Sequence, residues 1–336
     1  AVPSQVPHPA VDAPAGPHVP LPLYPFQRQR FWLDTAGATA RATRDPNGET
    51  VLETQLWPSA PLVAEHVVNG RPLLPAAAIL LTLVAAATAA GQGGRLADIE
   101  FAAPVEVRHP RRLRTMVGQA IRCFVGDDGW QLCAQARPGE PAAAPGAADL
   151  DRLHAACPDP VDPGAFHAWL EATGLRFGPT YDALRQIRRG PGQVLARLES
   201  PLPEIVLDAA LRSVGALHLG AGGAARIPAR IGAFHRFGPL ETARWVSAQV
   251  TERDEAILAT LDLFDESGQP VARIERLELR AAATLADTWR DWLHAVRWEP
   301  GPDLVEAAAI TAPLAGSAEH GRRLDALAAR YAREAV

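Results

Sequence analysis

A helix that is apolar on almost every side has few ways to be buried, and this sequence predicts one. Residues 75–90 read Pro-Ala-Ala-Ala-Ile-Leu-Leu-Thr-Leu-Val-Ala-Ala-Ala-Thr-Ala-Ala. Pro75 suits a first helical turn, where its missing N–H leaves no hydrogen bond unmade, and Gly91 with the Gly93-Gly94 pair ends the pattern. Because apolar residues occur all round this helix, we expect a sheet to surround it rather than to cover one face.

Strand-like runs follow this helix. They cover residues 96–107, 113–125 and 130–136, and Gly126-Asp-Asp-Gly129 separates the last two as a hairpin turn. One buried helix wrapped by a curled antiparallel sheet is the arrangement called a hotdog.

The same order of elements returns after a stretch rich in Ala, Pro and Asp at residues 138–162, which is typical of a linker. The second set comprises helices at 163–171 and 207–219, and strands at 193–198, 243–251, 256–265 and 271–281. Two helix-plus-hairpin halves predict an α+β fold, a double hotdog.

Composition excludes several classes of protein. The 336 residues are 48% hydrophobic, and 33 basic residues face 38 acidic ones, for a net charge of -5. A nucleic-acid binder would need a basic face, so we expect no nucleic-acid partner. Three cysteines without metal-type spacing predict neither a disulfide framework nor a metal site. The chain shows no membrane span and no signal peptide, and we expect a soluble cytoplasmic protein.

The candidate base is a histidine nine residues before the proline of the predicted helix. The segment reads His66-Val-Val-Asn-Gly70-Arg-Pro-Leu-Leu-Pro75. It places an imidazole on a strand or loop that feeds the helix N-terminus. Unpaired N–H groups and the helix dipole at that end suit an anionic oxygen such as a developing enolate. Taken alone, a histidine is more often structural.

Two further segments are ambiguous by themselves. Asp208 and Arg212 lie one helical turn apart at the predicted start of the second long helix, where Asp208 could simply complement the helix dipole. The segment Gly174-Leu-Arg-Phe-Gly-Pro-Thr-Tyr181 predicts a Gly-Pro turn that aims aromatic side chains inward.

In this order and spacing, the three segments resemble the dehydratase domain of modular polyketide synthases. That family carries a His-x-x-x-Gly-x-x-x-x-Pro motif, which His66, Gly70 and Pro75 match. Its second motif, Gly-Tyr-x-Tyr-Gly-Pro-x-Phe, is matched here by the glycines and proline Gly174, Gly178 and Pro179, with Leu175, Phe177 and Tyr181 at the aromatic positions.

The third motif of the family is an Asp followed four residues later by Gln or His. Asp208 matches it and Arg212 departs from it. Outside the motifs, residues 21–32 are similar to the linker that leaves an acyltransferase domain, and residues 292–300 to the segment after a dehydratase. The resemblance implies five parts: a post-acyltransferase linker at 1–34, an N-terminal hotdog at 35–140, a linker at 141–162, a C-terminal hotdog at 163–285, and a segment leading to the next domain at 286–336.

The resemblance implies dehydration of a β-hydroxyacyl thioester held on the phosphopantetheine of an acyl carrier protein, with no metal or redox cofactor. His66 would remove the α-proton and Asp208 would protonate the departing hydroxyl, while backbone N–H groups around residues 74–77 would stabilise the enolate-like oxygen. The implied catalytic residues are His66 and Asp208. The implied substrate-binding residues are Gly70, Leu74, Pro75, Ala76, Phe177, Gly178, Pro179, Tyr181 and Arg212.

The implied partners are the acyl carrier protein of the same module, neighbouring acyltransferase, ketoreductase or methyltransferase domains, and a second copy of the chain in a homodimer.

Arg212 leaves two outcomes open at this stage. A cation one turn from Asp208 favours the carboxylate, which is the wrong form for a proton donor. Either Arg212 turns outward and binds the carrier protein or the pantetheine phosphate, or it disables dehydration. The alternatives to a dehydratase are therefore a double-bond isomerase or ring-closing variant of the same fold, and a catalytically silent scaffold. The lack of a His-Pro-Leu-Leu opening also favours the scaffold, whereas the intact His66 motif opposes it.

Overall fold

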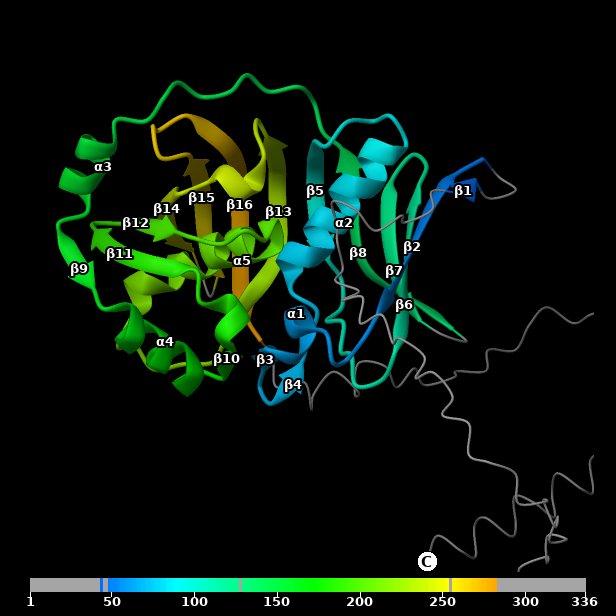
Figure 1. Cartoon of the computed structure of the whole chain (residues 1–336), viewed down its shortest axis with the longest axis horizontal. Coiled ribbons are helices and arrows are strands. Elements are labelled where there is room, and N and C mark those ends of the chain that lie inside the picture. The colour runs from blue at the N-terminus through cyan, green and yellow to red at the C-terminus, as the bar shows by residue number, and fades with distance from the viewer. Residues whose placement is uncertain (1–42, 45–47, 127–128, 254–255, 283–336) are drawn as a thin grey trace, which may run out of the picture. The chain divides into compact units, whose positions relative to one another are not determined.

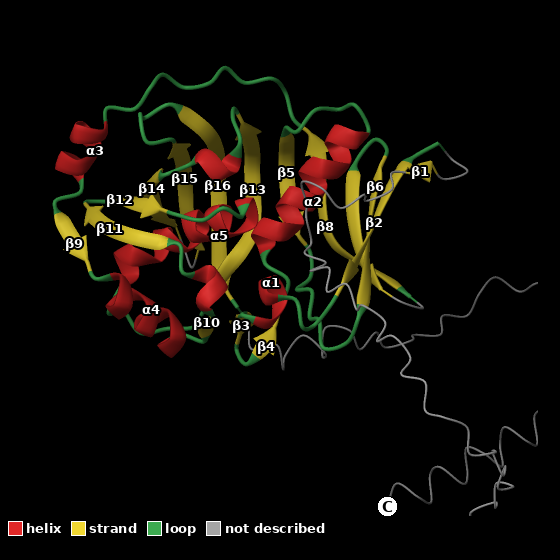
Figure 2. Cartoon of the chain, in the orientation of Figure 1, coloured by secondary structure: helices red, strands yellow, loops and turns green. Residues whose placement is uncertain are grey.

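The computed structural model describes residues 43–44, 48–126, 129–253 and 256–282, and these residues form two β-sheets with helices packed on them (Figures 1 and 2). The predicted segments 1–34 and 286–336 lie outside the described residues.

The N-terminal half supplies six strands to the long sheet and one long helix. Its strands in that sheet are β1 (Thr43–Arg44), β2 (Thr50–Leu56), β5 (Leu96–Phe101), β6 (Arg111–Val117), β7 (Ile121–Gly126) and β8 (Trp130–Pro138). Its other elements are α1 (Pro61–Ala64), β3 (His66–Val68), β4 (Arg71–Pro72) and α2 (Ala76–Ala89).

The C-terminal half repeats this plan with seven strands in the long sheet. They are β9 (Asp159–Val161), β11 (Leu184–Gly190), β12 (Gln193–Leu198), β13 (Arg226–Arg236), β14 (Trp245–Arg253), β15 (Ala256–Phe264) and β16 (Pro270–Ala281). The other elements are α3 (Leu150–Ala156), α4 (Pro163–Ala172), β10 (Leu175–Phe177), α5 (Pro203–Ser213) and the short 3-10 helices η1 (Pro179–Tyr181), η2 (Val214–His218) and η3 (Leu240–Thr242).

All strand pairs are antiparallel, and the long sheet runs through both halves in the order β1-β2-β6-β7-β8-β5-β13-β16-β15-β14-β12-β11-β9. Strands β5 and β13 join the halves by pairing Ile99 with Ile231 and Leu96 with Phe234. The small sheet β10-β3-β4 joins them a second time.

Both long helices contribute to one core. Nine residues of α2 are buried and its apolar side chains show almost no preferred face, so the prediction of a helix enclosed on nearly every side is correct. Residues of α2 and α5 belong to a single cluster of buried side chains that extends across both halves. Figure 1 shows these two helices lying against the strands of the long sheet.

Several predicted boundaries are wrong. The run 96–107 is strand only to Phe101, because the chain then turns to pair Leu73 with Glu106. The run 113–125 is a hairpin, β6 and β7, that turns at residues 118–120. Residues 141–162 contain α3 and β9, and β9 pairs with β11. Helix α5 begins at Pro203 rather than near residue 207, so Asp208 lies inside the helix and does not cap it.

One glycine fits tightly where the halves meet. Gly174 has a φ of +100°, and a Cβ at this position would lie 2.2 Å from the side-chain oxygen of Asn69 in the β3–β4 turn. Its carbonyl accepts the Asn69 N–H at 2.8 Å. Neither the backbone conformation nor the space admits a side chain without movement.

We therefore predict that Gly174→Ala lowers the free energy of unfolding by about 1–3 kcal/mol, measured by urea denaturation. Gly146→Ala is the matched control, because a Cβ there meets nothing within 4 Å and the backbone needs no positive φ. Equal stability of the two variants would show that the junction tolerates a side chain at residue 174.

Candidate active site

His66 is the first residue of β3 and is held by two hydrogen bonds to Leu73. The Leu73 N–H donates to the His66 carbonyl at 3.0 Å, and the His66 Nδ1 lies 3.0 Å from the Leu73 carbonyl oxygen. A carbonyl oxygen only accepts, so Nδ1 carries the ring proton. The other ring nitrogen, Nε2, keeps its lone pair and lies 3.9 Å from the Asp208 Oδ1.

The surroundings of His66 favour the neutral ring. Burial lowers the pKa of His66 below its ordinary value of 6.5, and the Arg212 guanidinium lowers it further. The Asp208 carboxylate and the Leu73 carbonyl act in the opposite direction without reversing the shift. At neutral pH the imidazole is therefore an uncharged base.

Asp208 and Arg212 form a buried ion pair on α5. The Arg212 Nε lies 2.7 Å from the Asp208 Oδ2, and each side chain is only 8% exposed. The Arg212 Nη2 also donates to the Tyr181 carbonyl at 2.8 Å, and its guanidinium carbon lies 4.2 Å from the centre of the Phe177 ring. Of the two outcomes left open for Arg212, the outward one does not agree with this geometry. The Asp208 carboxylate, the Tyr181 carbonyl and the Phe177 ring hold the guanidinium inside the site.

The second motif supports the first from across the small sheet. Phe177 of β10 pairs directly with His66 of β3, and their rings are 5.4 Å apart, edge to face. The Tyr181 ring lies 5.6 Å from the His66 ring, and its hydroxyl donates to the Leu62 carbonyl at 2.5 Å. The imidazole is thus fixed by aromatic packing as well as by hydrogen bonds.

Glu65 ties the turn of the second motif to the strand that carries the histidine. The Gly178 N–H donates to the Glu65 carbonyl at 2.9 Å, and the Thr180 N–H donates to the Glu65 Oε2 at 2.6 Å. A Cβ on Gly178 would lie 2.5 Å from the Glu65 Cγ, which explains the glycine.

Gly70 has a conformational role in the first motif. Asn69 and Gly70 have φ values of 49° and 78° and form the two-residue turn between β3 and β4. Positive φ at both turn residues defines the type I′ hairpin, for which Asn-Gly is the favoured pair.

His66 and Asp208 face a cavity of about 280 Å³ between the two halves. Of the other residues predicted to bind substrate, Leu74, Ala76, Phe177 and Arg212 line it. The remaining five are not among its lining residues: Gly70, Pro75, Gly178, Pro179 and Tyr181.

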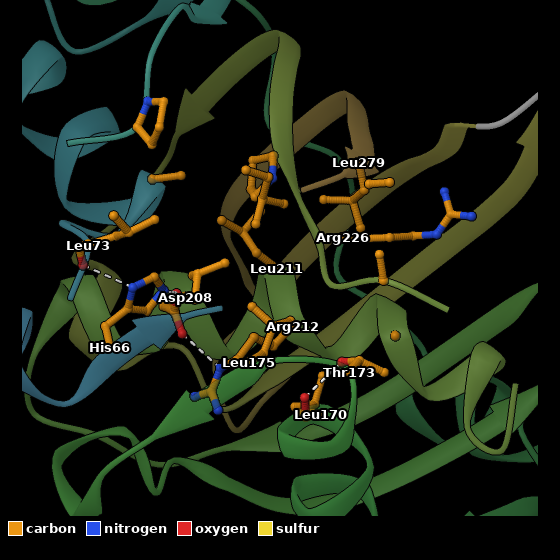
Figure 3. Close-up of a pocket in the computed structure, with 18 of the residues that line it drawn as sticks. His66, Leu73, Leu170, Thr173, Leu175, Asp208, Leu211, Arg212, Arg226 and Leu279 are labelled. Atoms are coloured by element: carbon orange, nitrogen blue, oxygen red, sulfur yellow. Dashed lines mark hydrogen bonds and ion pairs between the residues drawn. The ribbon is translucent and has the colours of Figure 1, made fainter. Parts of the chain in front are cut away.

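The cavity extends from the catalytic pair toward Arg226. Figure 3 shows His66 and Asp208 at one end and Arg226 at the other. In the same view Leu73 lies beside His66, and Thr173 lies on the side of Arg226. The lining also includes Leu74, Ile79, His218 and residues 221–224. Sequence reasoning did not assign Thr173, His218 or Arg226 to the site, because no periodicity distinguishes them.

The backbone donors near the start of α2 differ from the expected set. The Leu74 N–H donates to the Val105 carbonyl at 2.9 Å and is therefore occupied. Among the described residues no side chain caps α2, and Ile79 is the residue whose N–H donates to the Pro75 carbonyl. The amides of residues 76–78 thus precede the first intrahelical bond, and Ala76 lines the cavity.

Within the described residues there is no group of three His, Cys, Asp or Glu side chains placed to hold a metal ion. In the same part of the chain, no helix has the length and apolar character needed to cross a membrane.

The fold and the site together define a double hotdog with a His–Asp centre between its halves. A crystal structure of a trans-AT polyketide synthase dehydratase domain from Brevibacillus brevis superposes with a TM-score of 0.65 at 21% identity, covering 72% of this chain and 96% of that one. The dehydratase domain of the CurJ module of curacin polyketide synthase gives 0.66 at 20% identity, with 72% and 96% coverage. These similarities confirm the predicted fold.

Two family models match along the sequence. The family described as polyketide synthase dehydratase domain matches residues 39–127, and the one described as polyketide synthase dehydratase N-terminal domain matches residues 145–288. The chain belongs to the dehydratase domains of modular polyketide synthases.

Its curated relatives are much longer proteins. The spectinabilin polyketide synthase system protein NorA' of Streptomyces orinoci is 30% identical over 368 residues, which is 90% of this chain and 9% of that protein. The phenolphthiocerol synthesis polyketide synthase type I Pks15/1 of Mycobacterium bovis is 28% identical over 341 residues, covering 81% of this chain and 15% of that protein. The chain thus spans a small part of the length of these polyketide synthases.

Proposed function

We propose that this chain removes water from a β-hydroxyacyl thioester carried on the phosphopantetheine of an acyl carrier protein. The observation that supports this most is the pair of His66 and Asp208, whose Nε2 and Oδ1 atoms lie 3.9 Å apart at one end of a mostly apolar cavity. A neutral imidazole facing a carboxyl group across a small gap suits the removal of a proton and of an adjacent hydroxyl group.

His66 is the catalytic base in this proposal. Its Nε2 removes the proton from Cα, which the thioester carbonyl makes acidic. The charge that develops on the carbonyl oxygen is stabilised by the positive end of α2, close to the Ala76 amide. Asp208 contacts the β-hydroxyl on the other side of the substrate, so that the Cβ–O bond breaks as the double bond forms.

In the test, the protein is incubated with β-hydroxyacyl groups of several lengths, attached to carrier protein or to pantetheine, and the mass of the acyl groups is followed. We expect the acyl group to lose 18 mass units, the mass of water, when the protein is present and not when it is left out. If no acyl length loses water, the dehydratase proposal is wrong and the scaffold alternative gains support.

The Asp208–Arg212 ion pair favours a second candidate, a double-bond isomerase. Moving a double bond from the β,γ to the α,β position needs a base that removes one proton and returns it to another carbon, and no acid for a leaving hydroxyl. In deuterated solvent an isomerase would exchange hydrogen of a β,γ-unsaturated thioester without loss of water, whereas a β-hydroxyacyl thioester would stay unchanged.

The pKa of His66 predicts how dehydration depends on pH. Only the neutral ring accepts a proton, and its pKa in the folded chain is below 6.5. We expect kcat/KM to be constant near neutral pH and to fall on acidification with a midpoint below 6.5, measured with a pantetheine thioester. A midpoint above 6.5 would contradict the assignment of His66 as a buried neutral base.

A further inference from the structure

We propose that Ile79 of α2 sets the length of the acyl chain that the cavity accepts, because its side chain closes the end of the cavity farthest from the surface opening. The inference rests on the proposed function, since it concerns the thioester substrate of that site. Ile79 is a specificity-determining residue in this scheme and takes no part in the transfer of protons.

One side of the cavity leads from the catalytic pair to the surface. The residues of α5 and η2 that line it are spaced so that they share one face of this continuous helical segment: Asp208, Leu211, Arg212, Gly215 and His218. With rises of about 1.5 Å per residue in α5 and about 2.0 Å in η2, this face is roughly 17 Å long. Residues 221–224 come next along the chain, and they line the cavity and are exposed. In Figure 3, Leu211 lies between Asp208 and Arg226 on this side. A pantetheine arm that enters from the surface would therefore run along α5 and η2.

The acyl chain then lies on the other side of the pair, along the start of α2. In a thioester substrate the arm and the acyl chain extend in opposite directions from the reacting carbons. The Leu73 carbonyl accepts a hydrogen bond from the His66 Nδ1 at 3.0 Å, and α2 begins three residues after Leu73. Ala76 and Ile79, three residues apart on one face of α2, both line the cavity. This face thus continues the cavity from His66 into the N-terminal half.

The cavity stops at Ile79. The next residues on this face of α2 are Thr82 and Leu83, and neither lines the cavity. Leu80, which follows Ile79 in the helix, does not line it either and is 0% exposed. Ile79 itself is 4% exposed and belongs to the core cluster. Its apolar side chain is therefore the last one of α2 that a hydrocarbon chain would meet.

The loop after β5 encloses the same side, and hydrogen bonds hold both of its ends. Residues 101–105 line the cavity. The Ala102 N–H donates to the Cys133 carbonyl at 2.9 Å. At the other end of the loop, the Val105 carbonyl accepts the Leu74 N–H at 2.9 Å. Because the loop is fixed in this way, room for a longer acyl chain has to come from a side chain of α2.

The test measures the binding of saturated acyl-pantetheines to the full chain by titration calorimetry, with the acyl group lengthened in steps. These probes carry no hydroxyl group, so the measurement does not depend on dehydration. As long as the acyl chain enters apolar space, each added CH₂ group should tighten binding about fourfold. The gain should stop at a limiting length, where the chain reaches Ile79.

Substitutions of Ile79 should move this limiting length in both directions. Ile79→Ala frees space for about two to three carbon atoms, and we expect the limiting length to rise by that amount. Ile79→Phe fills part of the cavity and should lower it. Ile79→Val disturbs the core least and should raise it by about one carbon atom, which keeps the test open if the alanine variant does not fold.

Leu80→Ala is the matched control. Leu80 is the neighbouring residue of α2 and is buried in the same core, but it does not line the cavity. The variant should lose stability as Ile79→Ala does and keep the limiting length of the wild type.

A limiting length that is the same in the wild type and in the Ile79 variants would overturn the inference. It would indicate that the acyl chain leaves the cavity elsewhere, for example between the exposed residues Ala102 and Pro104. An equal shift in Leu80→Ala would also overturn it, as would a wild type that binds no acyl-pantetheine. If the limiting length moves as expected while β-hydroxyacyl thioesters lose no water, the role of Ile79 is supported and the proposed dehydration is wrong.

Discussion

Replacing His66 by alanine is expected to reduce the rate of water loss by about 10⁴-fold while leaving the fold intact. In the proposed dehydration the imidazole is the group that removes the α-proton. Its ring packs against the rings of Phe177 and Tyr181, and neither of these side chains is a base at neutral pH. Alanine therefore removes the base without bringing another one into its place. The measurement is single-turnover conversion of a β-hydroxyacyl pantetheine thioester followed by mass.

His109→Ala is the control for this experiment. His109 is an exposed residue of the loop between β5 and β6 and does not line the cavity. It should convert the substrate at the wild-type rate. Near-normal activity of His66→Ala, with a circular dichroism spectrum like that of the wild type, would remove His66 from the mechanism.

Asp208→Ala is expected to lower the free energy of unfolding by about 3–5 kcal/mol, because it leaves the buried Arg212 cation without its partner. The loss should be recovered largely in Asp208→Ala/Arg212→Leu, where neither charge remains. Urea denaturation of the wild type, both single variants and the double variant gives the complete cycle.

A half-exposed ion pair provides the matched comparison. Arg114 and Glu53 pair between β6 and β2 with side-chain exposures of 34% and 41%. Glu53→Ala should cost less than about 1 kcal/mol, since solvent screens that pair. Equal costs for Asp208→Ala and Glu53→Ala would show that the α5 pair is not buried in solution as it is in the structure.

The sequence was sufficient for the parts of the site that depend on local spacing. The interval from His66 to Pro75 contains a two-residue Asn-Gly turn between paired strands, and Pro75 directly precedes a helix whose apolar pattern is evident. Spacing also predicts that Arg212 can reach Asp208, because residues four apart share a helix face.

The direction in which Arg212 turns could not be predicted from its spacing. It depends on the Tyr181 carbonyl and the Phe177 ring, which are distant from Arg212 in the sequence and contact it in the folded chain. The same limit applies to β13, a strand that sequence reasoning missed. Its segment Arg226–Arg236 mixes Pro, Gly and Arg without clear alternation, yet it pairs on both edges with β5 and β16.

The whole account depends on one nitrogen atom, the Nε2 of His66, and ¹⁵N NMR of histidine-labelled protein reports on it directly. The His66 signals can be assigned by their absence in His66→Ala. We predict that at pH 7.5 the Nδ1 of His66 is protonated and its Nε2 is not, as the bond to the Leu73 carbonyl requires. A doubly protonated ring at that pH, or a proton on Nε2 instead of Nδ1, would contradict the account.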